Sequence, residues 1–327
     1  MIQGLLNKSA LNNGLKDFLR SLKVTYSTYN FLHKSGLEHN RGPYKDAGMK
    51  KFLFSSISSK DFAHLPMGDI PWMDKVSANE IQTKVDASKF SPEIKKEIVS
   101  FAENGFMILN HALDEKTVDS INAEIDKLLS EKKIEFTLGN KIMFANKASE
   151  LIRNITNKKE IKDVLEFALG KPVTPFQTIN FFTGSEQHAH SDSIHMTTYP
   201  LGYLIAIWVA LEDITEDAGP LSYYPGSHKL PYLLNDGYER GGNVFTVGAD
   251  SNYLKYEEKI GSVVKEKQLP KKIFTAKKGD VLIWHANLIH GGEKIIREGS
   301  TRKSMVVHYF AEDVIKYHEI TERPALL

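Results

Sequence analysis

The spacing of apolar residues changes near Lys171, and this change limits the folds that the chain can adopt. Before it, from Ser91 to Gly170, apolar residues recur at helical spacing. Helices followed by antiparallel strands are typical of an α+β arrangement in which helices cover one sheet of a β-sandwich or barrel. The sequence therefore predicts a mainly β core flanked by helices. The expected strands, separated by Gly- and Pro-containing turns, are PFQTINFF, YLIAIWVAL, GDVLIWHANLIH and SMVVHYF.

Three helices have clear start or stop signals. Ser91 is a typical N-cap, and Gly105 is placed to end that helix thirteen residues after Pro92. A short strand, FMIL, follows, and Asp114 is expected to open a second helix. The third helix, EIKDVLEFAL, should end at Gly170.

Two parts of the chain are less regular. Residues 1–88 show no sustained period apart from a possible amphipathic helix over Ser9–Leu22, and we expect an extension that packs on the core. Residues 89–327 should form the main domain. Within it, residues 231–269 are polar and too long for a hairpin loop, which is typical of a lid or a binding loop.

Composition excludes several classes of protein. The formal net charge is +1, so no broad basic surface is available for nucleic acid or an anionic membrane. The longest apolar run, Tyr203–Leu211, is about half of a membrane span, and the N-terminus lacks the apolar core of a secretory signal. We expect a cytoplasmic protein, a monomer or a homodimer, acting on a small molecule. Since the chain has no Cys and 12 His, any metal must bind His, Asp or Glu.

The segment GSEQHAHSDSIHM contains the strongest candidates for metal ligands. In an extended chain His190 and Asp192 point to the same side. About a hundred residues later, His290 ends an apolar run, and Arg302 precedes the next strand. Two His and one carboxylate can hold Fe(II) on one face and leave the other positions open. An Arg nearby could hold a carboxylate of a co-substrate with its planar fork.

These motifs together resemble the phytanoyl-CoA dioxygenase family of Fe(II)- and 2-oxoglutarate-dependent oxygenases, which includes ectoine hydroxylase. The resemblance extends over Ser91–Phe310. It is carried by GSEQHAHSD, by WVALEDITEDAGPLSYYPGSH, and by GDVLIWHANLIHGG followed by TRKSMVVHYF.

The resemblance implies a fold, a set of cofactors and an activity. The fold is a double-stranded β-helix, a jelly-roll barrel with the metal in its mouth. The activity is hydroxylation of an unactivated C–H bond of a small molecule, with 2-oxoglutarate and O2 consumed and succinate and CO2 released. Because the carboxylate ligand is present, hydroxylation or a related oxidation is favoured over halogenation. The implied iron ligands are His190, Asp192 and His290; the implied co-substrate contacts are Arg302, Gln177 and Trp208.

Other interpretations stay open at this point. The chain could be a non-catalytic metal-binding jelly roll, or a cupin-like protein that uses His188 with His190 and needs no 2-oxoglutarate. Arg297 competes with Arg302 for the carboxylate. Residues that could face the substrate, or could serve only the local structure, are Gln187, Ser193 and His195. Histidines for which we expect structural roles are His228 in a turn, His285 in a local hydrogen bond, and His308 in the core or beside a ligand.

Overall fold

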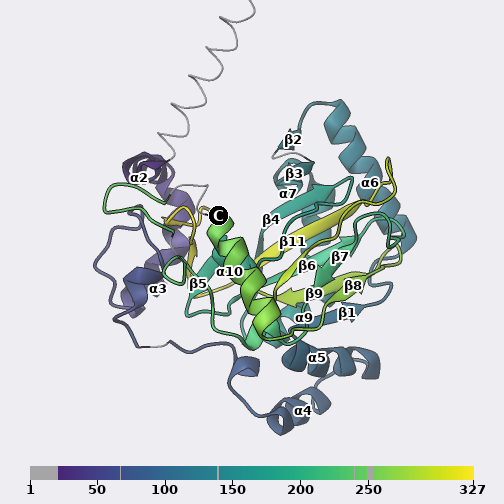
Figure 1. Ribbon diagram of the computed structural model, residues 1–327, viewed down its shortest axis with the longest axis horizontal. Coiled ribbons are helices and arrows are strands. Elements are labelled where there is room, and N and C mark those ends of the chain that lie inside the picture. Colours follow the sequence, from purple (N-terminus) through teal and green to yellow (C-terminus); the bar gives the residue numbers. More distant parts are fainter. Residues whose placement is uncertain (1–20, 67, 138–139, 239, 249–252) are drawn as a thin grey trace, which may run out of the picture.

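The computed structural model describes residues 21–327 except 67, 138–139, 239 and 249–252, and it is mixed helix and sheet (Figure 1). The predicted helix over Ser9–Leu22 falls almost entirely outside the described residues. The longer helices are α2 Lys23–Leu32, α4 Ala78–Asp86, α5 Pro92–Asn104, α6 Glu115–Ser130, α9 Lys159–Leu169 and α10 Tyr253–Glu266; the shorter ones are α3 Arg41–Asp46, α7 Ala145–Ala148 and α8 Glu150–Thr156.

The strands form one large sheet and two small ones, and every pairing is antiparallel. The large sheet has the order β1-β9-β6-β11-β4-β3-β2; the small sheets are β10-β7-β8 and β13-β12-β5. The bounds are β1 Phe106–Leu109, β2 Phe136–Thr137, β3 Lys141–Met143, β4 Val173–Phe181, β5 Thr197–Tyr199, β6 Leu204–Ala210, β7 Leu221–Tyr223, β8 Lys272–Phe274, β9 Val281–His285, β10 His290–Gly292, β11 Ser304–Ala311, β12 Ile315–His318 and β13 Arg323–Pro324.

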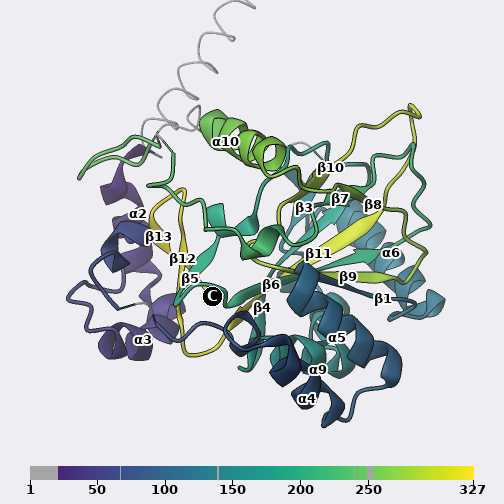
Figure 2. The same ribbon diagram turned by 60° about the horizontal axis from the view of Figure 1, so that its bottom comes forward.

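The large sheet is buried on both faces, because its strands alternate between two cores. In β6, Ile205 and Ile207 pack with apolar residues of α4, α5, α6 and α9. Ala206 and Trp208, on the opposite face, pack with Leu221 of β7 and with residues of β8 and β9. Figure 2 shows α4, α5 and α9 on one side of the sheet and α10 on the other. The predicted α+β fold with a jelly-roll core and flanking helices is confirmed.

The predicted helix ends are also found. The Ser91 hydroxyl accepts the backbone N–H of Ile94, and Gly105 ends α5 in the left-handed conformation with φ of 78°. A Cβ added at Gly105 would lie only 2.5 Å from the ring of His228, so a side chain there would also collide with that ring. The Asp114 carboxylate caps α6 by accepting the backbone N–H of Thr117.

One predicted element is divided in the structure. GDVLIWHANLIH does not form a single strand, because the chain turns after β9 and reaches the small sheet as β10. The turn closes with the Leu288 N–H donating to the His285 carbonyl, 2.8 Å away. The Asn287 amide fixes the turn by donating to the carbonyls of His228 and Leu230, at 3.1 and 2.8 Å. As a result, His290 opens a new strand rather than ending the old one.

Residues 23–62 and the C-terminal strands β12 and β13 lie side by side (Figure 2). Lys23 forms a 2.6 Å ion pair with Glu322, and Asn40 exchanges hydrogen bonds with the backbone of Lys316. Buried Glu319 accepts the backbone N–H and the hydroxyl of Ser59. The boundary at residue 88 stays a prediction. None of the helices in the described part of the chain is long and apolar enough to cross a lipid bilayer.

Candidate metal centre

A cavity of about 430 Å³ lies beside the face of the large sheet that carries Trp208. The predicted metal ligands line this cavity. His190, Asp192 and His290 are buried, and one ligand atom from each lies within 4.8 Å of the others. Asp192 Oδ1 is 3.9 Å from His190 Nε2 and 3.7 Å from His290 Nε2. One segment supplies His190 and Asp192, and β10, about a hundred residues later, supplies His290; the fold brings the three side chains together.

Backbone pairing holds the two histidines beside each other. His190 and His290 exchange both backbone N–H···O hydrogen bonds, each 2.9 Å long. Asp192 is not in a continuing strand but opens a short 3-10 helix, Asp192–Ile194. The carboxylate therefore reaches the site from a turn, although its position two residues after His190 suggested a regular strand.

The outer nitrogen of each imidazole is engaged by a backbone carbonyl. His190 Nδ1 lies 2.8 Å from the His188 carbonyl, and His290 Nδ1 lies 3.0 Å from the Leu288 carbonyl. A carbonyl only accepts, so Nδ1 carries a proton, and in the neutral form of each imidazole the lone pair is on Nε2, which faces the cluster. The Gln187 amide, 3.2 Å from His190 Nε2, can then donate to that nitrogen. Burial holds the pKa of His190 well below its ordinary value, so this imidazole is neutral.

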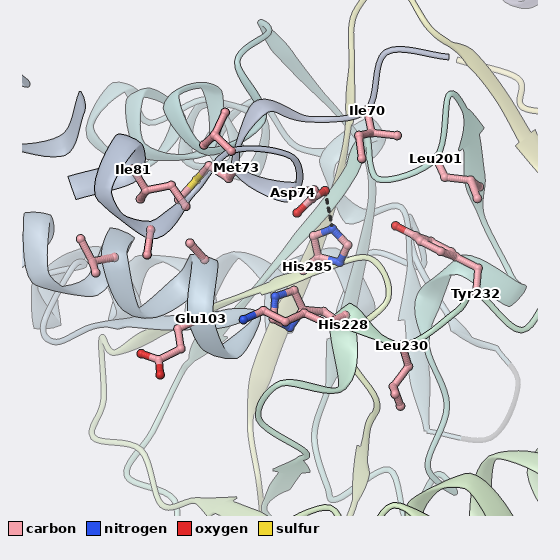
Figure 3. Close-up of a pocket in the computed structure, with 15 residues that line it drawn as sticks. Ile70, Met73, Asp74, Ile81, Glu103, Leu201, His228, Leu230, Tyr232 and His285 are labelled. Atoms are coloured by element: carbon pink, nitrogen blue, oxygen red, sulfur yellow. Dashed lines mark hydrogen bonds and ion pairs between the residues drawn. The ribbon is translucent and has the colours of Figure 1, made fainter. Parts of the chain in front are cut away.

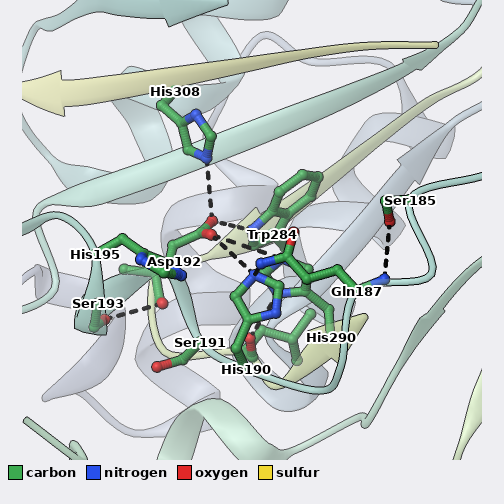
Figure 4. A network of polar contacts seen from close by, with 12 residues as sticks. Ser185, Gln187, His190, Ser191, Asp192, Ser193, His195, Trp284, His290 and His308 are labelled. Carbon is green, nitrogen blue, oxygen red and sulfur yellow. Dashed lines mark hydrogen bonds and ion pairs between the residues drawn. The ribbon is translucent and has the colours of Figure 1, made fainter. Parts of the chain in front are cut away.

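Asp192 is held by two groups that leave Oδ1 directed at the imidazoles (Figure 4). Trp284 Nε1 donates to Oδ2 at 2.7 Å, and His308 Nε2 lies 3.4 Å from the same oxygen. Burial acts to raise the pKa of Asp192, but the interactions with His290 and His308 outweigh it and lower that pKa well below the ordinary range. The carboxylate is therefore ionised at neutral pH, as a metal ligand must be.

Arg302 lines the same cavity and is fully buried. Its guanidinium donates to the Gly219 carbonyl and to the Ser304 hydroxyl, each at 3.0 Å. It lies over the rings of Phe181 and Trp208, 5.6 and 5.5 Å from their centroids. No carboxylate of the described residues pairs with it, and desolvation lowers its pKa to about 10. Among the described residues, the Arg302 guanidinium is therefore a buried cation without a counter-ion.

Gln177 and Trp208 also line the cavity, and both have unused polar atoms. Gln177 Oε1 and Trp208 Nε1 are buried without a hydrogen-bond partner among the described residues. Buried polar groups normally have a partner. These two atoms, with the guanidinium of Arg302, mark a polar region of the cavity that a ligand can satisfy.

The long insertion packs over the metal centre through α10. The Tyr256 hydroxyl accepts the backbone N–H of Ser191 at 2.9 Å. Ser191 lies between the predicted ligands His190 and Asp192 in the sequence. The Tyr253 hydroxyl lies 3.1 Å from Nε2 of His195, whose ring lines the cavity. The insertion thus contacts both the residue between the ligands and a residue expected to face the substrate.

Three residues weighed from the sequence lie elsewhere. Ser193 is fully buried, donates its hydroxyl to the Ala286 carbonyl and does not line the cavity. The His188 side chain is 77% exposed beside Glu257, so it cannot serve as the second histidine of a cupin-like site in this arrangement. Arg297 pairs at the surface with Asp217 at 2.9 Å, which leaves Arg302 as the buried arginine.

His228 and His285 lie outside the metal centre, in the wall of a second cavity of about 680 Å³ (Figure 3). His285 Nε2 is 3.3 Å from Asp74 Oδ2, and its Nδ1 accepts the backbone N–H of Asn287. The local hydrogen bond expected for His285 is present. Desolvation, followed by repulsion from His285, lowers the pKa of His228 to about 3.

This burial predicts a pH dependence of stability. An unfolded histidine titrates near pH 6.5, whereas folded His228 stays neutral down to about pH 3. Between these values the unfolded state binds more protons. The contribution of His228 to the free energy of unfolding is therefore full above pH 6.5, and it decreases by about 1.4 kcal/mol for each unit by which the pH is lowered. We expect His228→Gln to reduce the slope by about 1.4 kcal/mol per pH unit when the free energy of unfolding is measured by denaturant titration from pH 7 to 4.5, while the other buried histidines keep their share of it. The exposed His64→Gln control should keep the slope; parallel curves for wild type and His228→Gln would contradict the prediction.

Several residues of the cavity could not be found from the sequence. Lys141, Trp284 and the C-terminal residues His318, Thr321 and Arg323 line it. Trp284 is 92 positions from the carboxylate to which it donates. Only the order of strands in the sheet brings these side chains to the site, and no local motif marks them.

Comparisons with known proteins agree with this geometry. The family model for phytanoyl-CoA dioxygenase (PhyH) matches residues 101–303, more than half of the chain. Phytanoyl-CoA dioxygenase domain-containing protein 1 of Danio rerio is 30% identical over 186 residues, which are 53% of this chain and 59% of the zebrafish protein. The peroxisomal phytanoyl-CoA dioxygenase of Homo sapiens is 21% identical over 242 residues, 65% of this chain and 67% of the human protein.

Solved structures share the fold. The non-heme alpha ketoglutarate dependent epimerase SnoN from nogalamycin biosynthesis aligns with a TM-score of 0.52 at 19% identity, over 70% of this chain and 86% of its own. EctD from S. alaskensis, determined with 2-oxoglutarate and 5-hydroxyectoine, aligns with a TM-score of 0.52 at 20% identity, over 68% of this chain and 76% of its own. The family model, together with the buried His-Asp-His cluster in a jelly roll, places this chain in the phytanoyl-CoA dioxygenase family.

Proposed function

We propose that this chain is an Fe(II)- and 2-oxoglutarate-dependent dioxygenase that hydroxylates an unactivated C–H bond of a small molecule. The balanced reaction consumes the substrate, 2-oxoglutarate and O2, and it releases the hydroxylated product, succinate and CO2. One observation carries the proposal: a His-Asp-His cluster and a buried arginine, unpaired among the described residues, line the same cavity.

The donor set fits iron. His190 and His290 direct their Nε2 atoms toward the cluster, and Asp192 supplies an ionised oxygen. Two imidazoles and one carboxylate are the facial set typical of non-heme Fe(II) oxygenases. Trp284 and His308 keep the carboxylate oriented, as outer partners of metal ligands do.

The rest of the cavity fits 2-oxoglutarate. The Arg302 guanidinium would hold a carboxylate, since a planar fork suits that group and a buried cation gains from pairing. Gln177 and Trp208 would satisfy their unused atoms on the co-substrate. The epimerase SnoN, which shares the fold, has been crystallised in complex with Fe3+, alpha ketoglutarate and nogalamycin RO, and this supports the same assignment here.

When bound, Fe(II) and 2-oxoglutarate would supply the means to activate O2, which is the oxidant, and the protein would supply position and shielding. His188 and Leu288 carbonyls fix the tautomers of the two ligand histidines. Apolar side chains of Ile179, Phe181 and Val306 limit water on the sheet side. His195 and Gln187 face the cavity beside the metal ligands, and we assign them to the substrate side.

The proposal predicts succinate formation that requires both Fe(II) and 2-oxoglutarate. Purified protein with Fe(II), ascorbate, 2-oxoglutarate and O2 should form succinate, measured by NMR, and a chelator should stop it. A screen of small molecules for faster turnover would then identify the substrate. A protein that binds neither Fe(II) nor 2-oxoglutarate by calorimetry would contradict the proposal and would favour a non-catalytic jelly roll.

A further inference from the structure

The cavity extends beyond the metal centre to the C-terminal segment 318–323. His318, Thr321 and Arg323 line it there. Neighbouring residues anchor this segment firmly. Glu319 accepts hydrogen bonds from Ser59 and from the backbone of Asn235 in the insertion, and the carboxylate of Glu322 is engaged by Lys23. The positions of the side chains that face the cavity are therefore set by the fold.

Two of these side chains have buried polar atoms that the protein leaves unused. Arg323 Nε and Thr321 Oγ1 have no hydrogen-bond partner among the described residues. The guanidinium of Arg323 lies 5.4 Å from the ring centroid of Tyr26, and within the described structure it forms no ion pair. Desolvation lowers its pKa. Arg323 is half-buried, but a buried guanidinium N–H and a buried hydroxyl without partners are costly, so this arrangement points to a ligand.

The charges of the cavity wall indicate which ligand. Lys141, Arg302 and Arg323 are cationic, and Asp192 is the only carboxylate among the described residues that line the cavity. Burial lowers the pKa of His318 to about 3, so it is neutral at pH 7. Fe(II) and the 2-oxoglutarate dianion cancel each other. With both bound, the wall therefore retains two positive charges in excess.

Resting on the proposed function, we propose that the substrate is a small anion and that Arg323, assisted by Thr321, binds its acidic group. A carboxylate or a phosphate meets the requirement, because each offers oxygen acceptors for a guanidinium and for a hydroxyl. The binding of this group at the C-terminal end of the cavity would leave the rest of the molecule to extend toward His190 and Asp192.

The test uses calorimetry on the full chain loaded with Ni(II), an inert stand-in for Fe(II), and with saturating 2-oxoglutarate. The probes are hexanoate, hexyl phosphate and the uncharged hexanamide. We expect at least one anion to bind about 10- to 100-fold more tightly than hexanamide, the range for hydrogen bonds to charged groups. The preferred anion distinguishes a carboxylate substrate from a phosphate. Equal affinity for all three probes would overturn the proposal.

Variants then locate the binding group. Arg323→Gln should abolish the preference for the anion, and Arg323→Lys should restore part of it. Thr321→Val should reduce anion affinity about 3- to 10-fold through loss of one hydrogen bond. The surface variant Arg297→Gln should bind as wild type does. An unchanged anion preference in Arg323→Gln would overturn the assignment. Arg323→Gln could fail to fold. In that case the assignment would be overturned if Thr321→Val and Arg323→Lys both kept the full wild-type preference for the anion.

The binding of Ni(II) and of 2-oxoglutarate is measured first, because this separates a failure of the proposed function from a failure of the anionic substrate. Failure to bind Ni(II) and 2-oxoglutarate counts against the proposed function. Normal loading without a preference for anions counts against the anionic substrate alone.

Discussion

Asp192→Ala is expected to abolish succinate formation and to remove tight Fe(II) binding. The carboxylate is the only anionic member of the cluster, and its Oδ1 lies within 4 Å of both ligand nitrogens. Because changing a mere partner of a metal ligand costs about 10- to 100-fold, loss of the ligand itself should exceed about 100-fold. Turnover is followed by NMR of succinate, and metal binding by calorimetry.

Asp192→Asn serves as the matched control for structure. Its amide oxygen can still accept the Trp284 indole N–H, which Asp192→Ala would leave buried and unpaired. An unpaired buried donor costs about 1–3 kcal/mol, so the alanine variant should be less stable than the asparagine variant. Both should lose turnover, because both remove the charge. An active Asp192→Ala enzyme would contradict the assigned metal centre.

The strands of the core could be predicted because each has two different buried faces. In β6, alternate residues pack against helices and against the small sheet, so the whole run is apolar and rich in branched side chains. Helix ends could be predicted for a local reason as well. Ser91, Asp114 and the two terminal glycines act on atoms a few residues away.

The parts of the site that could not be predicted depend on distant contacts. The turn that sends His290 to another sheet is fixed when Asn287 donates to carbonyls 57 and 59 positions away. The helix within the insertion is amphipathic, but its placement over Ser191 depends on the hydroxyl of Tyr256. Arg323 reaches the cavity because β13 pairs with β12 and β12 with β5. Nothing in the sequence around Arg323 contains that information.

His188 shows why a shared spacing is not a shared role. His188 precedes His190 by two residues, the same spacing that separates His190 from Asp192. Its ring is nevertheless exposed, and only its backbone carbonyl contacts the site, where it accepts a hydrogen bond from His190 Nδ1. The extended geometry assumed for HAHSD does not continue through the motif, since the chain enters a 3-10 helix at Asp192. Alternation is a reliable guide only inside a paired strand.

Arg302→Met is expected to raise the KM for 2-oxoglutarate about 100-fold while leaving the protein folded. The loss follows from removing a charge-assisted, bidentate contact, for which about 3 kcal/mol is a reasonable magnitude. The stability should change by less than about 2 kcal/mol, well below the roughly 3–5 kcal/mol expected when a buried ion pair is broken. Arg302 has no carboxylate partner among the described residues, so two lost hydrogen bonds are offset by relief of a buried charge. Initial rates of succinate formation and denaturant titrations measure the two effects.

Arg302→Lys separates charge from shape. A lysine keeps the charge but lacks the planar fork, so its KM should lie between those of wild type and Arg302→Met. If the guanidinium were needed only for folding, Arg302→Met would be strongly destabilised and its KM would follow the loss of folded protein. A folded variant with an unchanged KM would contradict the role assigned to Arg302. A buried charge without a counter-ion does not stabilise the fold. A rise in KM without a loss of stability is therefore the result expected of a residue whose role is to bind a ligand.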